Sequence, residues 1–465
     1  MESLEATAPI AAVGPVSNAE RISSVDALRG FALLGILLLN IVGFAMHFAA
    51  YDDPTVTGGG VANGATPVNL WLWIVMHVLA EGKMRCIFSM VFGASMILLT
   101  LRAEEKGASS ADIYYRRTLW LMLFGIVHGY LLWAGELLYL YALAGLALFP
   151  FRRMRPRSLL IIGCTIVFVL GALNIGKGFA VRDMIQTATA ANLAEKQGKK
   201  LTEDQKDAKK QWEEMQKGMK PTPDDLKKDA EGWRGNLLSV IKTRAKIVFG
   251  YIHSQPYYSF LNWDVWSMML IGMGLMKMGS LNASKPYKFY LIAALIGYGI
   301  GIPVNSYTAW VLVKNNFDVV THIFTGVTYD LGRLTVALGH VALLMIVAKA
   351  GALHWLMSRL AAVGQMAFSN YVTHSVVCST LFTGFGFGLY GKLERYQLYY
   401  VVLAIWVFQL AVSPIWLRRF RFGPLEWCWR SLTYWKRQPM RIVPKEAPVG
   451  VGIPGEPQNA NLSAT

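Results

Sequence analysis

Residues 27–48 read ALRGFALLGILLLNIVGFAMHF, a run in which Arg29 is the only charged residue. A helix of about 20 apolar residues crosses a hydrocarbon core about 30 Å thick. No small-residue cleavage site follows the run, so we interpret it as a retained transmembrane helix and not as a signal peptide. This stretch indicates a membrane protein.

The rest of the chain has the composition of a multispanning membrane protein. Of its 465 residues, 54% are hydrophobic and 16% are charged, whereas soluble proteins are about one-quarter charged. This composition excludes a secreted disulfide scaffold, a disordered protein and an ordinary cytosolic enzyme. We predict an all-α polytopic membrane helix bundle of about ten transmembrane helices. After the first run, the predicted spans are Met84–Leu101, Thr118–Trp133, Leu137–Phe151, Leu159–Lys177, Phe260–Lys277, Phe289–Val304, Leu331–Val347, Leu360–Phe385 and Leu398–Leu417.

The basic residues orient these spans, because Lys and Arg concentrate in the cytoplasmic loops of membrane proteins. If the apolar segment 68–82 lies in the interface without crossing, the arginine-rich segments 116–117, 152–157 and 418–421 fall on one side. We therefore predict cytoplasmic N- and C-termini and an interfacial helix at 68–82, before the second span. The same bias accounts for the net charge of +16, so we expect no nucleic-acid partner.

The cysteines give no sign of a metal site or a disulfide framework. No CxxC pair occurs, and each cysteine stands alone in apolar or aromatic surroundings. We therefore expect no metal. The four residues are Cys86, Cys164, Cys378 and Cys428.

The chain divides into two predicted membrane domains around one charged insertion. Residues 21–177 and residues 251–437 each hold five predicted spans. Residues 178–250 between them are rich in Lys, Glu, Gln and Ala, and we predict a helical insertion on the extracytoplasmic side. Pro221 and Pro223 should break it into two pieces. The insertion is either a solvated hairpin without chemistry or a lid or docking element.

Both ends of the chain are predicted to be disordered. Residues 1–20 precede the first span with mixed composition, and residues 438–465 contain several Pro and Gly.

Ionisable groups in a membrane span are costly, so each of them is a functional hypothesis. Asp26 and Arg29 lie three residues apart on one helical face and can neutralise each other. The pair either fixes the depth of the helix or presents an arginine to a phosphate group. Asn40 and His47, seven residues apart, should share a face of the same helix. His47 is either a boundary residue or a general base or acyl carrier, with Asn40 orienting it or stabilising an oxyanion.

Two further groups of polar residues lie in the first half of the chain. Glu81 and Arg85 are four residues apart and can pair, which would leave Lys83 for an anion. His128 lies in the middle of the predicted third span, and Glu136 closes the short turn after it. His128 is either a hydrogen-bonded core residue or lines a polar pocket.

The second half of the chain repeats some of these features. Asp330 and Arg333 have the same Asp-x-x-Arg spacing as the first span. Asn370 and His374 belong to a polar stripe on the predicted ninth span. Such a stripe either joins helices by hydrogen bonds or takes part in chemistry.

Several of these motifs together resemble one family, the YeiB-like bacterial inner-membrane proteins with a C-terminal domain of unknown function. The resemblance covers nearly the whole chain except the insertion and the tail. It implies a multi-pass protein of the bacterial inner membrane, and the family is largely uncharacterised. The motifs are VDALRG at residues 25–30, EGK at 81–83, GELLYLYA at 135–142, GQMAFSNY at 364–371 and FGPLEW at 422–427.

The first helix is also similar to that of the transmembrane acyltransferases, including the lysosomal heparan glucosaminide N-acetyltransferase group. Those proteins move an acyl group from cytoplasmic acyl-CoA to a sugar on the far side of the membrane. Their catalytic pair is an asparagine on the first helix and a histidine after it. By order, Asn40 and His47 take these places here, although the interval between them is shorter.

This resemblance implies acyl-CoA, acetyl-CoA-like, as the donor, and a sugar, glycoconjugate or other small molecule as the acceptor. The donor is multiply anionic, and His128 could help to pass the acyl group outward. The expected donor-binding residues are Arg29, Lys83, Arg85, Arg116 and Arg117.

A proton-coupled transporter or permease for a small polar solute is the alternative, because buried histidines in several spans could form a proton path. Either protein would sit in a lipid bilayer. Gly297, Gly299 and Gly301 permit either a homodimer or internal packing. The remaining polar-pocket candidates are Asp26, Glu81, Glu136, Asp330, Arg333, Asn370 and His374.

Overall fold

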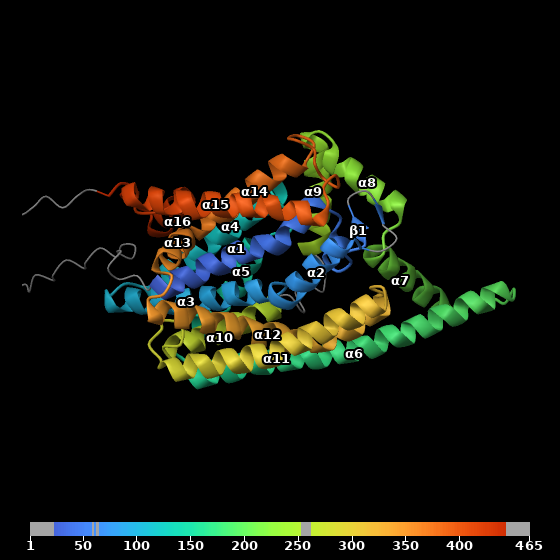
Figure 1. Ribbon diagram of the computed structural model, residues 1–465, viewed down its shortest axis with the longest axis horizontal. Coiled ribbons are helices and arrows are strands. Elements are labelled where there is room, and N and C mark those ends of the chain that lie inside the picture. Colours follow the sequence, from blue (N-terminus) through green and yellow to red (C-terminus); the bar gives the residue numbers. More distant parts are fainter. Residues whose placement is uncertain (1–22, 58–59, 62–64, 253–261, 443–465) are drawn as a thin grey trace, which may run out of the picture.

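The computed structural model describes residues 23–57, 60–61, 65–252 and 262–442. They form a helical bundle whose long helices run along one axis of the molecule (Figure 1). The only strands in these ranges are β1 (Val56–Thr57) and β2 (Gly60–Val61), which pair antiparallel. The predicted all-α membrane helix bundle is confirmed. The predicted disorder of residues 1–20 and of residues 443–465 concerns segments outside the described residues. For residues 438–442 the prediction is wrong, because the Met440 carbonyl accepts the Arg421 N–H at 2.9 Å and the Ile442 N–H donates to the Arg419 carbonyl.

The helix α1 (Ser23–Ala45) lies at the centre of the bundle. It is apolar on all sides, and 72% of its most apolar window is buried, against 22% for α6 (Pro156–Lys196) and α15 (Arg395–Arg419). A helix that is hydrophobic all round belongs in a core. Large apolar side chains on the two outer helices, such as Phe168 and Val407, are exposed. These outer faces suit contact with lipid.

Six helices in the described residues are long and apolar enough to cross a membrane, and they coincide with six of the predicted spans. They are Ser23–Ala45, Pro67–Glu105, Pro156–Lys196, Tyr287–Lys314 (α11), Val319–Ala350 (α12) and Arg395–Arg419. The other predicted spans coincide with shorter or less apolar helices. Among these are α4 (Ser110–Leu131) and α10 (Asn262–Lys277). The count of about ten spans stays a prediction.

The predicted fourth span, Leu137–Phe151, is not one continuous helix. It consists of α5 (Leu138–Leu146) and a short 3₁₀ helix, η3 (Phe149–Arg153). At 1.5 Å per residue, the 9 residues of α5 reach about 14 Å, roughly half of a hydrocarbon core.

The predicted ninth span, Leu360–Phe385, is likewise divided. It forms α13 (His354–Gln365) and α14 (Ala367–Phe382), with the break at Met366. The start of α14 is held by α16 (Pro424–Tyr434), whose Glu426 carboxylate accepts the backbone N–H groups of Phe368 and Ser369 at 2.6 and 3.0 Å. An acidic side chain satisfies the free N–H groups of a helix start, so Glu426 stabilises the beginning of α14 after the break.

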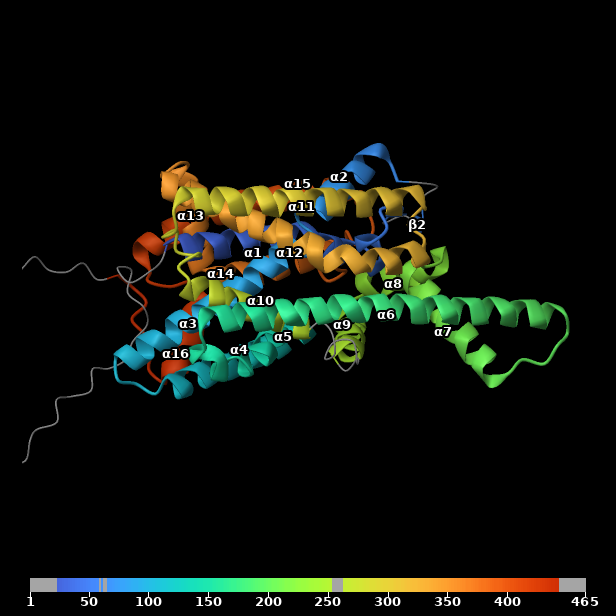
Figure 2. The same cartoon turned by 90° about the horizontal axis from the view of Figure 1, so that it is seen from below.

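The segment predicted to lie in the interface forms α2 (Pro67–Leu79) and is followed after a short turn by α3 (Lys83–Glu105). Gly82 in the turn has φ +71°, a conformation that favours glycine, and it interrupts the helix. In both views α2 continues in the direction of α3 (Figures 1 and 2). The interfacial position of α2 stays a prediction.

Glycines allow the central helices to touch. A Cβ atom on Gly30 would collide with the backbone oxygen of Leu360 in α13, and one on Gly364 with that of Asp26 in α1. Small residues let membrane helices approach this closely. Gly297 and Gly301 of α11 pack against α12 in the same way. This contact supports internal packing for these two glycines, one of the two predicted alternatives.

The charged insertion continues α6 beyond the bundle and returns through α7 (Glu203–Met219), α8 (Pro223–Arg234) and α9 (Leu237–Ile252) (Figures 1 and 2). The break between α7 and α8 falls at residues 220–222, as the prolines predicted. Trp233 of α8 is buried, and the Tyr390 hydroxyl donates to Asp229. Part of the insertion therefore packs on the bundle.

The described chain begins and ends at one end of the bundle, where α1 starts and α16 lies (Figure 1). Residues just after α16 remain attached, because the Ile442 N–H donates to the Arg419 carbonyl at 3.1 Å. This arrangement agrees with termini on one side of the membrane. The assignment of that side to the cytoplasm stays a prediction.

Candidate functional site

A partly open cavity of about 220 Å³ lies between α1, α3, α4, α14 and α16. Most of its wall is apolar, which suits an aliphatic ligand better than a sugar or an amino acid. The apolar lining includes Ile36, Phe88, Phe92, Leu98, Leu99, Leu121, Leu137 and Leu138.

The outer part of this cavity carries four arginines and two carboxylates. The carboxylates are Asp26 and Glu426, and the arginines are Arg29, Arg102, Arg117 and Arg430. Asp26 and Arg29 lie in the first two turns of α1 and Arg102 lies in the last turn of α3, and these two helix ends lie at the same end of the bundle (Figure 1). The excess of guanidinium groups favours an anionic ligand group at this end.

The predicted ion pair between Asp26 and Arg29 is confirmed. Arg29 Nη1 lies 2.5 Å from Asp26 Oδ1, and Nη2 donates to Ser95 Oγ of α3 at 2.8 Å. The Arg117 guanidinium lies 3.8 Å above the ring of Trp429 in α16. Both arginines are therefore held in place by α1, α3, α4 and α16, and both face the cavity.

Glu426 is a buried carboxylate in the cavity wall that the sequence analysis did not single out. It caps α14 and also accepts the Ser369 hydroxyl at 2.6 Å. Burial raises the pKa of this carboxyl, and the hydrogen bonds from Ser369 and Phe368 partly oppose that shift. The motif around Glu426 indicated a family and not a contact, so sequence alone gave no sign of the cap.

Two tyrosines of the cavity wall, Tyr141 and Tyr371, belong to α5 and α14. The ring of Tyr371 lies beside that of His128, with 5.1 Å between the ring centroids. Leu138, another lining residue, follows Glu136 closely in the chain. Two residues of the cavity wall thus lie next to His128 and Glu136, the polar residues that were predicted around the short turn after the third span.

His128 forms a buried chain of three polar side chains with Glu136 and Ser375. Its Nδ1 bonds to Glu136 Oε2, and its Nε2 lies 2.7 Å from Ser375 Oγ of α14. The exposed fractions of His128 and Ser375 are 3% and 1%. Glu136 Oε1 accepts the backbone N–H groups of Leu138 and Tyr139 at the start of α5. Of the two predicted settings for His128, the hydrogen-bonded core is the observed one.

Ser375 was missed by sequence reasoning. It is separated from His128 by 247 residues, and many serines occur in the helices of membrane proteins. The available signal was its place one residue after His374 in a polar stripe. That signal does not specify the partner.

The predicted pair of Asn40 and His47 is not arranged as the spacing suggested. Helix α1 ends at Ala45, so His47 lies outside it and the helical-face argument for this pair is wrong. His47 Nδ1 accepts the Ala49 N–H at 3.1 Å and caps the 3₁₀ helix η2 (Phe48–Tyr51). Neither residue lines the cavity, although Asn40 lies one turn beyond Ile36, which does.

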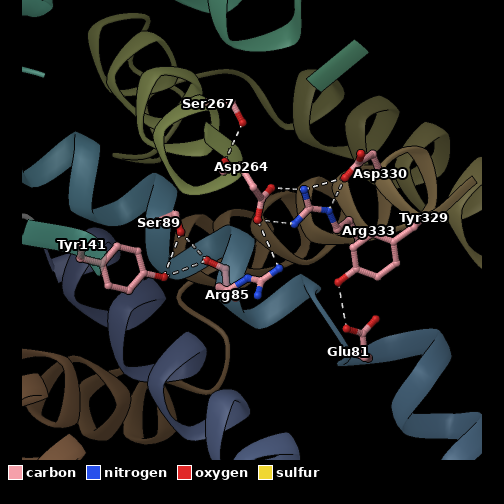
Figure 3. A network of polar contacts seen from close by, with 9 residues as sticks. All are labelled: Glu81, Arg85, Ser89, Tyr141, Asp264, Ser267, Tyr329, Asp330 and Arg333. Carbon is pink, nitrogen blue, oxygen red and sulfur yellow. Dashed lines mark hydrogen bonds and ion pairs between the residues drawn. The ribbon is translucent and has the colours of Figure 1, made fainter. Parts of the chain in front are cut away.

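The predicted pair of Glu81 and Arg85 is also wrong. Glu81 Oε1 accepts the Tyr329 hydroxyl at 2.9 Å, and Arg85 Nη2 donates to Asp264 Oδ2 at 3.2 Å (Figure 3). Lys83 is not free for an anion, because its Nζ donates to the His77 carbonyl at 2.6 Å and to Asn305 Oδ1 at 2.8 Å.

Lys83 and Arg85 lie deeper along the bundle than Arg29. Ser95, which contacts Arg29, follows Lys83 by twelve residues of α3, or about 18 Å of helix. Lys83 and Arg85 therefore do not lie with Arg29 in one group that could bind a single donor phosphate. Of the five expected donor-binding residues, Arg29 and Arg117 line the cavity, whereas Lys83, Arg85 and Arg116 do not.

Asp264 of α10 lies between two guanidinium groups, those of Arg85 and Arg333 (Figure 3). Arg333 Nη1 donates to Asp264 Oδ2 at 3.0 Å, and Arg333 Nε donates to Asp330 Oδ1 at 2.9 Å. The Asp330–Arg333 pairing thus follows the predicted spacing. Two arginines and two carboxylates balance each other here, as buried charges require. We call Arg85, Asp264, Asp330 and Arg333 the ion network.

Asn370 and His374 join helices and do not face the cavity. Asn370 Nδ2 donates to Ser413 Oγ of α15 at 3.1 Å, and His374 Nε2 lies 2.8 Å from Gln409 Oε1. Gln409 Nε2 in turn donates to the Asn370 carbonyl at 2.9 Å. This matches the interhelical reading of the polar stripe.

Within the described residues, no group of three or more His, Cys, Asp or Glu side chains could hold a metal ion. The cavity and the His128 chain are the two features of the described residues on which we base a function.

Comparison with known proteins finds uncharacterised relatives over most of the chain. Residues 275–436 match the family model described as Protein of unknown function (DUF418). The chain is 28% identical to the uncharacterized protein YxaH of Bacillus subtilis, over 92% of this chain and 97% of that protein. It is also 28% identical to the uncharacterized protein YeiB of Escherichia coli, over 89% of this chain and 96% of that protein. No solved structure matches. These matches confirm the resemblance found in the motifs: the chain is similar to YeiB and YxaH over most of its length, and its C-terminal part matches the DUF418 model.

Proposed function

We propose that this protein is a membrane acyltransferase that takes an acyl group from an acyl-CoA-like thioester and passes it to a sugar or glycoconjugate outside the cytoplasm. The observation that carries this proposal is the cavity, which combines an arginine-rich outer part with apolar side chains and is lined by Tyr371, whose ring lies beside that of His128. The protein would act in the bacterial inner membrane, with the arginine-rich end toward the cytoplasm.

The two parts of the cavity match the two parts of such a donor. The phosphates of coenzyme A carry several negative charges, and a guanidinium binds phosphate oxygens in a bidentate manner. Arg29 and Arg117 line the outer part. The acyl chain is apolar and gains free energy when phenylalanine and leucine side chains such as Phe92 and Leu121 exclude water from it.

The chemistry would fall to His128 at the inner end. With a proton on Nδ1 bonded to Glu136, the Nε2 atom of the imidazole can act as a general base. Glu136 is fixed by two backbone N–H groups, so it holds the imidazole in one orientation. Burial of the pair keeps bulk water away from a thioester, which water would hydrolyse.

Binding of octanoyl-CoA to the full-length protein in lipid nanodiscs tests the proposal. Arg117→Gln should weaken binding about tenfold or more, because a charge-assisted hydrogen bond contributes about 1.5–3 kcal/mol. Arg116→Gln is the matched control, because Arg116 is the neighbouring arginine and does not line the cavity. Equal affinity of the wild type and both variants, or no binding of octanoyl-CoA or acetyl-CoA, would contradict the proposal.

A proton-coupled transporter is the second candidate, and the ion network favours it. Buried ionisable groups beside a helix break are typical of transport pathways. Here Lys83 and Arg85 follow the break between α2 and α3. Uptake into proteoliposomes driven by a pH gradient, without any acyl-CoA, would support this reading. Transfer from acyl-CoA without flux would exclude it.

A further inference from the structure

The polar chain of Ser375, His128 and Glu136 has the connectivity of a nucleophile, a base and an orienting carboxylate. We propose that Ser375 is a catalytic nucleophile that carries the acyl group as a serine ester between donor and acceptor. This inference rests on the proposed acyl transfer and adds a covalent step and a residue to it.

The geometry around the imidazole sets the roles of the three groups. Ser375 Oγ lies 2.7 Å from His128 Nε2, within the range expected of a nucleophile and its base. Glu136 bonds to the other ring nitrogen, so the proton stays on Nδ1 and the Nε2 lone pair faces the serine. The same arrangement of roles recurs on unrelated folds and is recognised by geometry.

The neighbours of Ser375 on α14 show that its contact is not the usual one for a hydroxyl in a helix. Thr373 and Thr380 each donate to the carbonyl four residues earlier, at 2.8 Å. Such back-bonding satisfies a helical hydroxyl locally. Ser375 is instead hydrogen-bonded to an imidazole from α4. Ser379, one turn later, donates to the Leu132 carbonyl and contacts no titratable group by hydrogen bond.

Tyr371 separates the cavity from this triad. It lies one turn before Ser375 on α14, lines the cavity, and places its ring 5.1 Å from the His128 ring. A thioester in the cavity would therefore reach Ser375 after a movement of the Tyr371 side chain. We assign Tyr371 as a positioning residue that keeps the triad dry until a donor is bound.

The proposed reaction has two steps. Ser375 Oγ attacks the thioester carbonyl carbon, the O–C bond forms and the C–S bond breaks. The serine proton passes to His128 Nε2 and from there to the departing thiolate sulfur of coenzyme A. In the second step an acceptor hydroxyl gives its proton to Nε2 and attacks the ester. Its O–C bond forms, and Ser375 leaves with the proton restored. No oxidant or reductant is required.

The experiment is a search for the ester on the full-length protein in nanodiscs. The protein is incubated with octanoyl-CoA and with acetyl-CoA, quenched in acid, digested, and analysed by mass spectrometry for an adduct within residues 367–382. An adduct on Ser375 that resists neutral hydroxylamine is the expected result. Cys378 lies in the same helix, and an adduct there would be a thioester that hydroxylamine cleaves.

Three variants test the assignment of Ser375 as the nucleophile. Ser375→Ala should lose the adduct and at least about a hundredfold of the transfer rate, as expected when a covalent route is removed, while octanoyl-CoA still binds. Ser375→Cys should carry a hydroxylamine-sensitive adduct instead, which requires a folded triad. Ser379→Ala is the matched control and should keep the adduct on Ser375.

The outcomes separate this inference from the function on which it rests. Suppose that octanoyl-CoA binds and the acyl group is transferred, but no adduct forms on Ser375 or the Ser375→Ala variant keeps full activity. Ser375 would then not be a nucleophile, and the proposed acyltransferase function would remain. If neither donor binds the wild type, both proposals fall. An adduct on Ser375 with retained binding in Ser375→Ala supports both.

Discussion

Replacing Asp264 by asparagine is expected to lower the free energy of unfolding by about 3–5 kcal/mol. The carboxylate is 8% exposed and accepts hydrogen bonds from Arg85 and Arg333, and Arg333 is 2% exposed. Removing one partner of a buried ion pair costs about this much, because the remaining charge stays buried without compensation. With asparagine, two guanidinium groups would face Asp330 alone.

A second substitution should relieve part of this cost. Arg85→Met removes the surplus charge and leaves Arg333 beside Asp330, whose Oδ1 accepts Arg333 Nε at 2.9 Å. The double variant should therefore be more stable than the sum of the single effects by about 1 kcal/mol or more. Asp207→Asn on the exposed face of α7 is the matched control, with an expected change within about 0.5 kcal/mol.

The measurement is equilibrium unfolding of the full-length protein in mixed micelles, followed by tryptophan fluorescence. The reasoning fails if Asp264→Asn costs less than about 1 kcal/mol, or if adding Arg85→Met gives no relief beyond additivity. A stable Asp264→Asn protein that loses solute uptake would instead favour the transporter candidate.

Three further predictions concern packing, pH and capping. Gly30→Ala should destabilise the fold by about 1–3 kcal/mol in the same unfolding assay, because the added Cβ meets a backbone oxygen of α13. Gly299→Ala is the control and should change stability little, because Gly299 faces open space. Burial raises the pKa of the Glu426 carboxyl above its ordinary value of 4.5, so its contribution to stability is present at low pH and is lost as the pH rises above that value. A pH series of melting curves should show this loss, and Glu426→Gln should reduce the pH dependence of the melting temperature. Thr222 Oγ1 accepts the Asp225 N–H and caps α8, and hydrogen bonds from Thr222 lower the pKa of the Asp225 carboxyl. Thr222→Ala should therefore cost about 1 kcal/mol of local stability, measured by hydrogen exchange in α8.

The sequence predicted side-chain pairs well wherever one helix carries both partners. Asp26 with Arg29 and Asp330 with Arg333 lie three residues apart within α1 and α12, and both pairs form. The spacing rule depends on an unbroken helix. It therefore failed for Glu81 with Arg85, because Gly82 interrupts the helix between them.

Features that join distant segments could not be read from the sequence. The pairing of Ser375 with His128 spans 247 residues, and Asp264 meets Arg85 across 179 residues. No periodicity or local spacing encodes such contacts, since they depend on which helix faces pack together. Composition alone predicted the membrane bundle, because apolar runs of span length are specified locally.

The ion network and the cavity are connected through α3, so they are not independent features. Ser89 Oγ donates to the Arg85 carbonyl at 2.8 Å and lies 2.9 Å from the hydroxyl of Tyr141, which lines the inner cavity (Figure 3). Arg85 itself is held by Asp264. A shift of α3 on loss of the Asp264 contact would therefore move Ser89 and the Tyr141 ring. For this reason Asp264→Asn should also weaken octanoyl-CoA binding, although Asp264 does not line the cavity. The ion network would then support acyl transfer by fixing the position of a cavity wall. This role differs from proton transport, because no charge has to cross the membrane.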